Sequence, residues 1–167
     1  RAYMGKWIDW NNPKTFCEKL QWLKLYNRNP IFTKMVDKYS VKDYVKDLIG
    51  EKHIIPTIAL FENPDKIDWD ILPDEFVLKT THGGGCRGVV ICRDKSLLDK
   101  EEAVKKLWDS YRTDIYNDLC EWPYKNVKKR IIAEKLLIPD DGGPLNDYKI
   151  MCFNGQPHYI MYVSGRF

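Results

Sequence analysis

Long apolar runs are missing from this chain of 167 residues. No run approaches the roughly 20 apolar residues that a membrane-spanning helix needs. No cationic start leads into an apolar signal segment either. We therefore expect a protein without a membrane span and place it in the cytoplasm.

Paired cysteine motifs are also missing. The five cysteines are scattered without a C-x-x-C pair, and the chain has only three histidines. A zinc site or a disulfide framework is therefore not expected. Reduced thiols fit a cytosolic protein.

A strong charge of one sign is missing as well. Lys and Arg number 27 against 24 for Asp and Glu, and the signs are interleaved. This balance argues against nucleic acid as a partner, because such proteins concentrate cations on one face. The chain is 44% hydrophobic and 13% aromatic, which excludes disorder. We expect one folded domain or two small lobes.

Apolar residues at helical spacing predict helices in residues 11–30, 37–50 and 96–119. The first should begin at Asn12 with Pro13 in its first turn, and it should end at Pro30. Its expected apolar face consists of Phe16, Leu20, Trp22 and Leu23. Gly50 should cap the second helix. The third is expected to be continuous, with Leu107 and Ile115 on one face.

Strands are predicted in residues 54–61, 76–80, 88–92, 130–138, 147–153 and 156–163. Pro56 favours an edge position for the first. Asn154 and Gly155 predict a two-residue turn between the last two. This order of elements fits an antiparallel sheet with a covering helix, an α+β fold.

The segment "FVLKTTHGGGCRGVVIC", residues 76–92, places three consecutive glycines between two β-rich runs. Glycines let backbone N–H groups approach an anion closely. A lysine on the preceding strand adds a point charge for a phosphate. A Rossmann motif would open a helix at this point, whereas here a strand follows. A mobile, solvated loop is the alternative.

Six stretches that follow one another in the chain resemble the TupA-like family of the ATP-grasp superfamily. They are "KTFCEKLQWLKLYNRNP", "VDKYSVKDYV", "IGEKHIIP", "LPDEFVLKTTHGGG", "EWPYKNVKKRIIAEKLL" and "DYKIMCFNGQP". The resemblance implies two α+β lobes with antiparallel sheets around a nucleotide cleft. It places a helical N-terminal lobe in residues 1–75, a glycine-loop subdomain in 76–133, and the start of a second subdomain in 134–167.

The resemblance also implies residue roles. Lys79 would neutralise the α- and β-phosphates of ATP, and Lys38 would reach the phosphates from the other side of the cleft. The loop over the β- and γ-phosphates would consist of His82, Gly83, Gly84, Gly85, Arg87 and Gly88. Glu134 would accept a hydrogen bond from the adenine amino group. The backbone of Lys135 and Leu137 would complete the adenine contacts, with Asp147 and Lys149 near ribose or phosphate.

Each role has a simpler structural alternative. Lys38 could be a solvated residue in the first turn of its helix, and His82 and Arg87 could be solvated in their loop. Glu134 could be an exposed position of an alternating strand, but if it is buried, a carboxylate in this apolar strand must find a partner. Asp147 and Lys149 could form a cross-strand ion pair.

The activity that the resemblance implies is ATP-dependent ligation of a carboxylate to an amine through an acyl phosphate, with Mg²⁺ as the metal. The acceptor would be a bacterial surface glycan that carries uronic acids. We expect the metal ligands beyond residue 167, so the chain is either a fragment or has lost catalysis. The alternatives are a kinase, a sugar-nucleotide glycosyltransferase and a non-catalytic nucleotide-binding module.

Overall fold

The computed structural model describes residues 5, 7–85, 87–139, 142–143 and 145–165. The chain divides into two units, Arg1–Lys135 and Leu136–Phe167, and each is considered by itself. The lobe boundaries expected after residues 75 and 133 stay predictions. The predicted α+β class is confirmed, since helices accompany antiparallel sheets.

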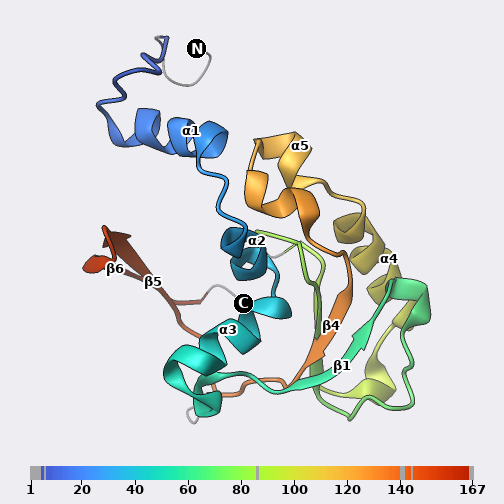
Figure 1. The fold of residues 1–167 in the computed structure, drawn as a ribbon. Helices are drawn as coiled ribbons and strands as arrows, with labels where there is room; N and C mark the ends of the chain where they lie inside the picture. The colour runs from blue at the N-terminus through green and yellow to red at the C-terminus, as the bar shows by residue number, and fades with distance from the viewer. Residues whose placement is uncertain (1–4, 6, 86, 140–141, 144, 166–167) are drawn as a thin grey trace. The chain divides into compact units, whose positions relative to one another are not determined.

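The first unit contains the helices and a four-stranded sheet (Figure 1). Its helices are α1 (Phe16–Tyr26), α2 (Ile31–Val36), α3 (Ser40–Ile49), α4 (Lys100–Tyr111) and α5 (Ile115–Leu119). Its strands are β1 (Thr57–Phe61), β2 (Phe76–Thr80), β3 (Val89–Cys92) and β4 (Ile131–Glu134). Among the described residues, no helix combines the length and apolar character needed to cross a bilayer.

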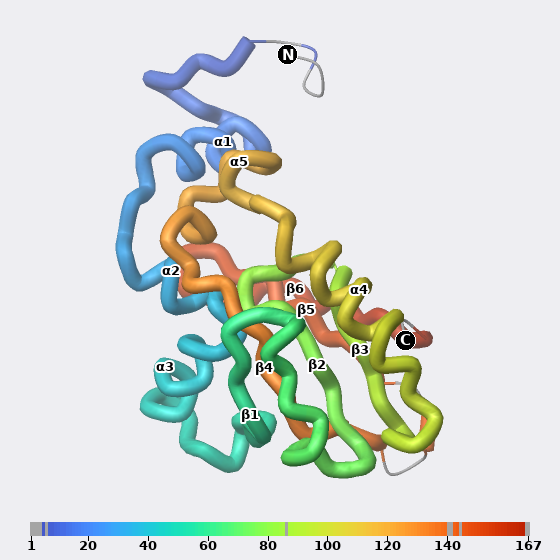
Figure 2. Tube along the Cα trace, turned by 90° about the vertical axis from the view of Figure 1, so that its right-hand side faces the viewer, coloured from blue at the N-terminus to red at the C-terminus, as the bar shows by residue number. Residues whose placement is uncertain are grey.

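The sheet has the order β1-β4-β2-β3 with antiparallel neighbours throughout. The expected edge position of the strand after Pro56 is confirmed, because β1 lies at one edge. Ile131, Ile132 and Ala133 of the interior strand β4 are fully buried. Helix α4 lies against β2 and β3 (Figure 2). Its Leu107 is part of the buried core. Burial of this apolar surface is the main force that holds the sheet and helix together.

The predicted start of the first helix is wrong. Thr15 rather than Asn12 caps α1, because the Thr15 N–H donates to Glu18 Oε2 (2.8 Å) and the Glu18 N–H donates back to Thr15 Oγ1 (3.3 Å). This capping box satisfies two backbone donors and fixes the helix start. The expected apolar face is also not a core, since Phe16 is 61% exposed. The helix ends at Tyr26, and Pro30 leads into α2 instead.

The predicted third helix is interrupted. Helix α4 ends at Tyr111, where Lys129 Nζ donates to the carbonyls of Tyr111 (3.1 Å) and Thr113 (2.8 Å). Asp114 then accepts from the Asn117 N–H (3.0 Å) and caps α5. A cation at a helix C-terminus and a carboxylate at the next N-terminus stabilise this break.

The second unit contains a hairpin of β5 (Asp147–Phe153) and β6 (Gln156–Val163). Its predicted turn is confirmed: Asn154 and Gly155 have φ values of 49° and 77°. Two positive φ values are typical of the tight turn that matches strand twist. The end of the second predicted helix is confirmed as well, because Gly50 caps α3 with a φ of 91°.

Candidate nucleotide-phosphate site

The glycine segment is a β-hairpin, as predicted. Strands β2 and β3 pair from Phe76 with Cys92 to Lys79 with Val89, and residues 81–88 connect them. Cys86 of this loop lies outside the described residues. The described cysteines, Cys17, Cys92, Cys120 and Cys152, are free.

Glycine serves two different structural roles in this loop. A Cβ on Gly83 would overlap Thr80 Oγ1 and lie 2.9 Å from Ser110 Oγ, and a Cβ on Gly88 would lie 2.6 Å from Ser110 Oγ. Thr80 and Ser110 form a buried hydrogen bond of 2.8 Å here. Gly83 and Gly88 therefore let the loop pack on α4. Gly84 has only an ordinary contact at 3.5 Å, which leaves its backbone open.

Two lysines meet at the glycine loop. Lys38 Nζ donates to the backbone carbonyl of Gly83, and Lys79 lies on β2 beside it. Together they line a small cavity of about 60 Å³ with Thr80, Gly83, Gly84, Gly85, Arg87 and Val89. Burial, and after it the charge of Lys79, lower the pKa of Lys38. Among the described residues, no carboxylate forms an ion pair with Lys38. The cavity therefore has an excess of positive charge, which favours an anion.

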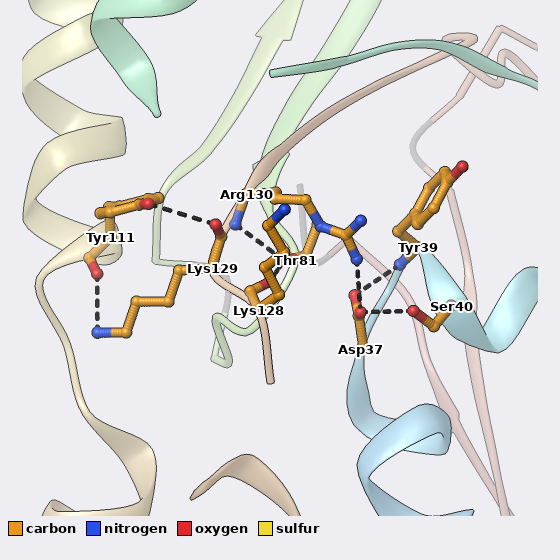
Figure 3. A network of polar contacts seen from close by, with 8 residues as sticks. All are labelled: Asp37, Tyr39, Ser40, Thr81, Tyr111, Lys128, Lys129 and Arg130. Atoms are coloured by element: carbon orange, nitrogen blue, oxygen red, sulfur yellow. Dashed lines mark hydrogen bonds and ion pairs between the residues drawn. The ribbon is translucent and has the colours of Figure 1, made fainter. Parts of the chain in front are cut away.

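A polar network around Asp37, Thr81 and Arg130, drawn in Figure 3, holds the segment that carries Lys38. The Lys38 N–H donates to the carbonyl of Thr81 (2.9 Å). The preceding residue, Asp37, pairs with Arg130 Nη2 (2.9 Å) and accepts from Ser40 Oγ (2.7 Å) and the Tyr39 N–H (3.0 Å). Lys38 is half-buried just before α3, with its backbone held at Thr81 and its Nζ donating to Gly83, so the alternative of a solvated residue in the first turn of the helix is wrong.

Glu134 lies at the end of β4, between two lysines. Its carboxylate is 5% exposed and pairs with Lys42 Nζ through Oε1 (2.5 Å) and with Lys79 Nζ through Oε2. The Oε2 atom makes no hydrogen bond of regular geometry, so the Lys79 ammonium compensates it mainly as a charge. The predicted need of this buried carboxylate for a partner is confirmed.

His82 lies under the loop and not in solvent. Its ring is buried and meets the Tyr111 ring edge-on, with centroids 5.7 Å apart. Neither ring nitrogen makes a hydrogen bond of regular geometry. Burial, and then the charge of Lys129, lower the pKa of His82 to about 4. The solvated alternative is wrong for His82, while its phosphate role stays a prediction.

This lowered pKa predicts a pH dependence of stability. Between pH 6.5 and about 4 the unfolded chain binds a proton at His82 that the folded chain does not bind. The contribution of neutral His82 to the free energy of unfolding is therefore fully present above pH 6.5. It is lost as the pH decreases, and the loss reaches about 3 kcal/mol at pH 4. Urea unfolding should show that the free energy of unfolding decreases less between pH 7 and pH 4.5 in His82→Phe than in the wild type. Exposed His53→Gln is the control, and an equal loss in all three proteins would contradict the prediction.

The other predicted site residues are spread over both units. Arg87 is exposed beside the cavity. The Lys135 N–H donates to the Pro56 carbonyl (3.1 Å), so this donor is already used within the protein. Leu137 belongs to the second unit. There, Asp147 and Lys149 pair along one strand and not across two, so the cross-strand alternative is wrong. The ligand roles of these residues stay predictions.

The sequence interpretation missed several residues that shape the site. Lys42 pairs with Glu134, and Asp37 and Arg130 hold the segment that carries Lys38. Thr80 and Ser110 support the loop. The only available signal was the spacing of Lys38 and Lys42, four residues apart at the start of a predicted helix.

A glycine hairpin with a strand lysine, attached to a mixed α and antiparallel β structure, is consistent with an ATP-grasp-like fold. The family model described as TupA-like ATPgrasp matches residues 18–167. The chain therefore belongs to the TupA-like ATP-grasp family, as its sequence motifs indicate. Searches of curated proteins and of solved structures found no match. Membership suggests ligase-type activity that depends on ATP.

Enzymes of the ATP-grasp family use Mg²⁺ together with ATP. Among the described residues, no group of three or more His, Cys, Asp or Glu side chains could hold a metal ion. Mg²⁺ prefers oxygen ligands in octahedral geometry, with one or two carboxylates beside substrate phosphates. The described residues therefore contain no cage of three or more protein ligands for a metal ion.

Proposed function

We propose that this protein is an ATP-dependent carboxylate–amine ligase of bacterial surface polysaccharide biosynthesis. The observation that carries the proposal is that Lys38, whose Nζ donates to the Gly83 carbonyl, and Lys79 line one cavity with excess positive charge. Charge neutralisation of this kind is what phosphoryl transfer requires of a protein. Family membership supports ATP as the source of the phosphate.

The reaction would have two steps. A carboxylate oxygen of a uronic acid attacks the γ-phosphorus of ATP, so that an acyl phosphate forms and ADP leaves. An amine then attacks the acyl carbon and loses a proton, and phosphate leaves as the amide forms. Lys38, Lys79 and the loop backbone would stabilise charge on the transferred group. The uronic acid and the amine rest on family analogy, because a fold does not determine its acceptor.

Glu134 would recognise the base of the nucleotide. Its Oε2 is buried without a hydrogen bond of regular geometry, so it is suited to accept one from the adenine amino group. We expect wild-type protein to bind ATP more tightly than GTP, whose carbonyl would face the carboxylate.

Lys79→Met should weaken the binding of both nucleotides by about tenfold or more, because a charge-assisted contact contributes roughly 1.5 to 3 kcal/mol. Calorimetric titration measures both effects, and equal affinity for ATP and GTP would remove Glu134 from base recognition.

Hydroxylamine trapping tests the chemistry. The protein is incubated with ATP, Mg²⁺, a uronic acid oligosaccharide and hydroxylamine, and Lys79→Met is the control. Hydroxamate and ADP in equal amounts support the ligase. ADP without hydroxamate indicates a kinase that phosphorylates a hydroxyl, and nucleotide binding without turnover indicates a non-catalytic module.

A glycosyltransferase is the remaining alternative, and it would need carboxylates for a metal-bound sugar nucleotide. The chain has one D-x-D sequence, Asp68 to Asp70. Both aspartates are exposed, and Asp68 Oδ1 accepts from the Asp70 N–H (3.1 Å), as in a simple turn. This pair lies outside the lysine-lined cavity. The ligase therefore has the better support.

A further inference from the structure

Lys42 is a partly buried cation that neither the family roles nor the proposed reaction uses. Its Nζ lies within bonding distance of three oxygens: the Ile55 carbonyl (2.7 Å), Thr57 Oγ1 (2.8 Å) and Glu134 Oε1 (2.5 Å). Two of these contacts are hydrogen bonds and the third is an ion pair, which together match the three N–H donors of an ammonium. Lys42 is therefore fixed in place, and it does not line the lysine-lined cavity.

Lys79 binds the other oxygen of the same carboxylate, but its situation differs. Glu134 is its only ion-pair partner among the described residues, and its side chain is more exposed than that of Lys42, at 25% against 14%. Lys79 also lines the cavity with Lys38 and the glycines. Of the two lysines that neutralise Glu134, one is immobilised and the other is free to turn toward an anion.

A buried carboxylate that loses all its counter-ions is strongly destabilising. If Lys79 were the only partner of Glu134, a phosphate that attracted Lys79 would leave such a charge behind. Lys42 removes this penalty because it keeps its contact with Oε1 whatever Lys79 does.

We propose that Lys42 is a positioning residue that acts as the permanent counter-ion of Glu134 and thereby allows Lys79 to exchange this carboxylate for a ligand phosphate. The exchange exposes Oε2 as a hydrogen-bond acceptor at the moment a phosphate binds. This inference rests on the proposed function. The exchange couples phosphate binding to adenine recognition, so adenine binding must strengthen phosphate binding by the same factor.

Inorganic tripolyphosphate tests the exchange without a base and without a reaction. Its affinity is measured by calorimetry for the wild type, Lys42→Met, Glu134→Gln and the double variant. Lys46→Met is the matched control, since it removes the same charge one helical turn further on, where Lys46 forms an exposed pair with Glu51 (2.9 Å). Thermal melting of each variant reports on its fold.

We expect Lys42→Met to weaken tripolyphosphate about tenfold, because Lys79 then stays with Glu134. Lys46→Met should change the affinity less than about twofold. Glu134→Gln should tighten binding, because Lys79 is released. In the Glu134→Gln background, Lys42→Met should have no larger effect than Lys46→Met.

An equal weakening by Lys42→Met with and without the Glu134 charge would overturn the proposal, because Lys42 would then act as a general cation. Weaker binding in Glu134→Gln would overturn it as well. This second variant keeps the test decisive even if Lys42→Met does not fold. Hydroxylamine trapping is independent of these titrations, so failure of the ligase and failure of the exchange are distinguishable.

Discussion

Gly88→Ala should destabilise the protein by about 4 kcal/mol, the sum of two penalties. The added methyl would collide with Ser110, whose Oγ lies 2.6 Å from the new Cβ, and overpacking of this kind costs roughly 1 to 3 kcal/mol. Gly88 also has a φ of 65°, and an alanine there adds about 1 to 2 kcal/mol of backbone strain. Together these terms correspond to a decrease in melting temperature of roughly 10 °C.

Gly84→Ala is the matched control in the same loop. A Cβ on Gly84 meets only Ile115 Cδ1, at 3.5 Å, and its φ is not positive. We expect its melting temperature to stay within a few degrees of the wild type, while its affinity for ATP falls because Gly84 lines the cavity. Scanning calorimetry and nucleotide titration of both variants separate the two glycine roles. Equal melting temperatures for Gly88→Ala and Gly84→Ala would contradict the packing role.

The glycine loop shows how far its sequence could be interpreted. The strands on both sides predict the hairpin, and the glycines predict close approach of the backbone to something. They do not say to what. For Gly88 the neighbour is Ser110, which lies more than 20 residues away in the chain and reaches the loop only through the packing of α4 on the sheet. Gly83 meets the same Ser110 in addition to Thr80 on the preceding strand.

The sequence predicts secondary structure correctly where only one turn or cap residue is present in a short segment. The Asn154-Gly155 turn and the Gly50 cap are as predicted, and the buried strand predicted over residues 130–138 is present but covers only Ile131–Glu134. The first helix was misplaced because two caps compete within a few residues, and the reciprocal pair of Thr15 and Glu18 is stronger than Asn12 followed by proline. The break after α4 depends on Lys129, a distant residue that no local pattern includes.

The charged residues of the site were only partly predictable. Lys38 and Lys79 were identified through family motifs, and the structure brings both to one cavity. Lys42 and Arg130 were not identified, because isolated charges in a lysine-rich chain are indistinguishable from solvated ones. Their burial depends on which strand lies beside which helix, and that is a property of the tertiary structure.

Asp37→Ala should destabilise the protein by about 4 kcal/mol, close to the effect of Gly88→Ala. The carboxylate is 6% exposed and compensates Arg130, whose side chain is 16% exposed and stacks on the Tyr39 ring at 4.7 Å. Its removal leaves a largely buried guanidinium without its counter-ion, and breaking a buried ion pair by deleting one partner costs roughly 3 to 5 kcal/mol. The donors of Tyr39 and Ser40 lose their acceptor as well.

A double-mutant cycle isolates this pair. Asp37→Ala, Arg130→Met and the double variant are compared by urea unfolding, with exposed Asp43→Ala as the control for loss of one carboxylate on the same segment. We expect the double variant to be more stable than Asp37→Ala alone, because no unpaired charge stays buried. ATP affinity should fall in Asp37→Ala, since Lys38 then loses the anchor of its neighbour, whereas Asp43→Ala should bind normally. Additive losses of stability in the cycle would show that Asp37 and Arg130 are not coupled, and unchanged ATP affinity in a folded Asp37→Ala protein would show that this network does not position Lys38.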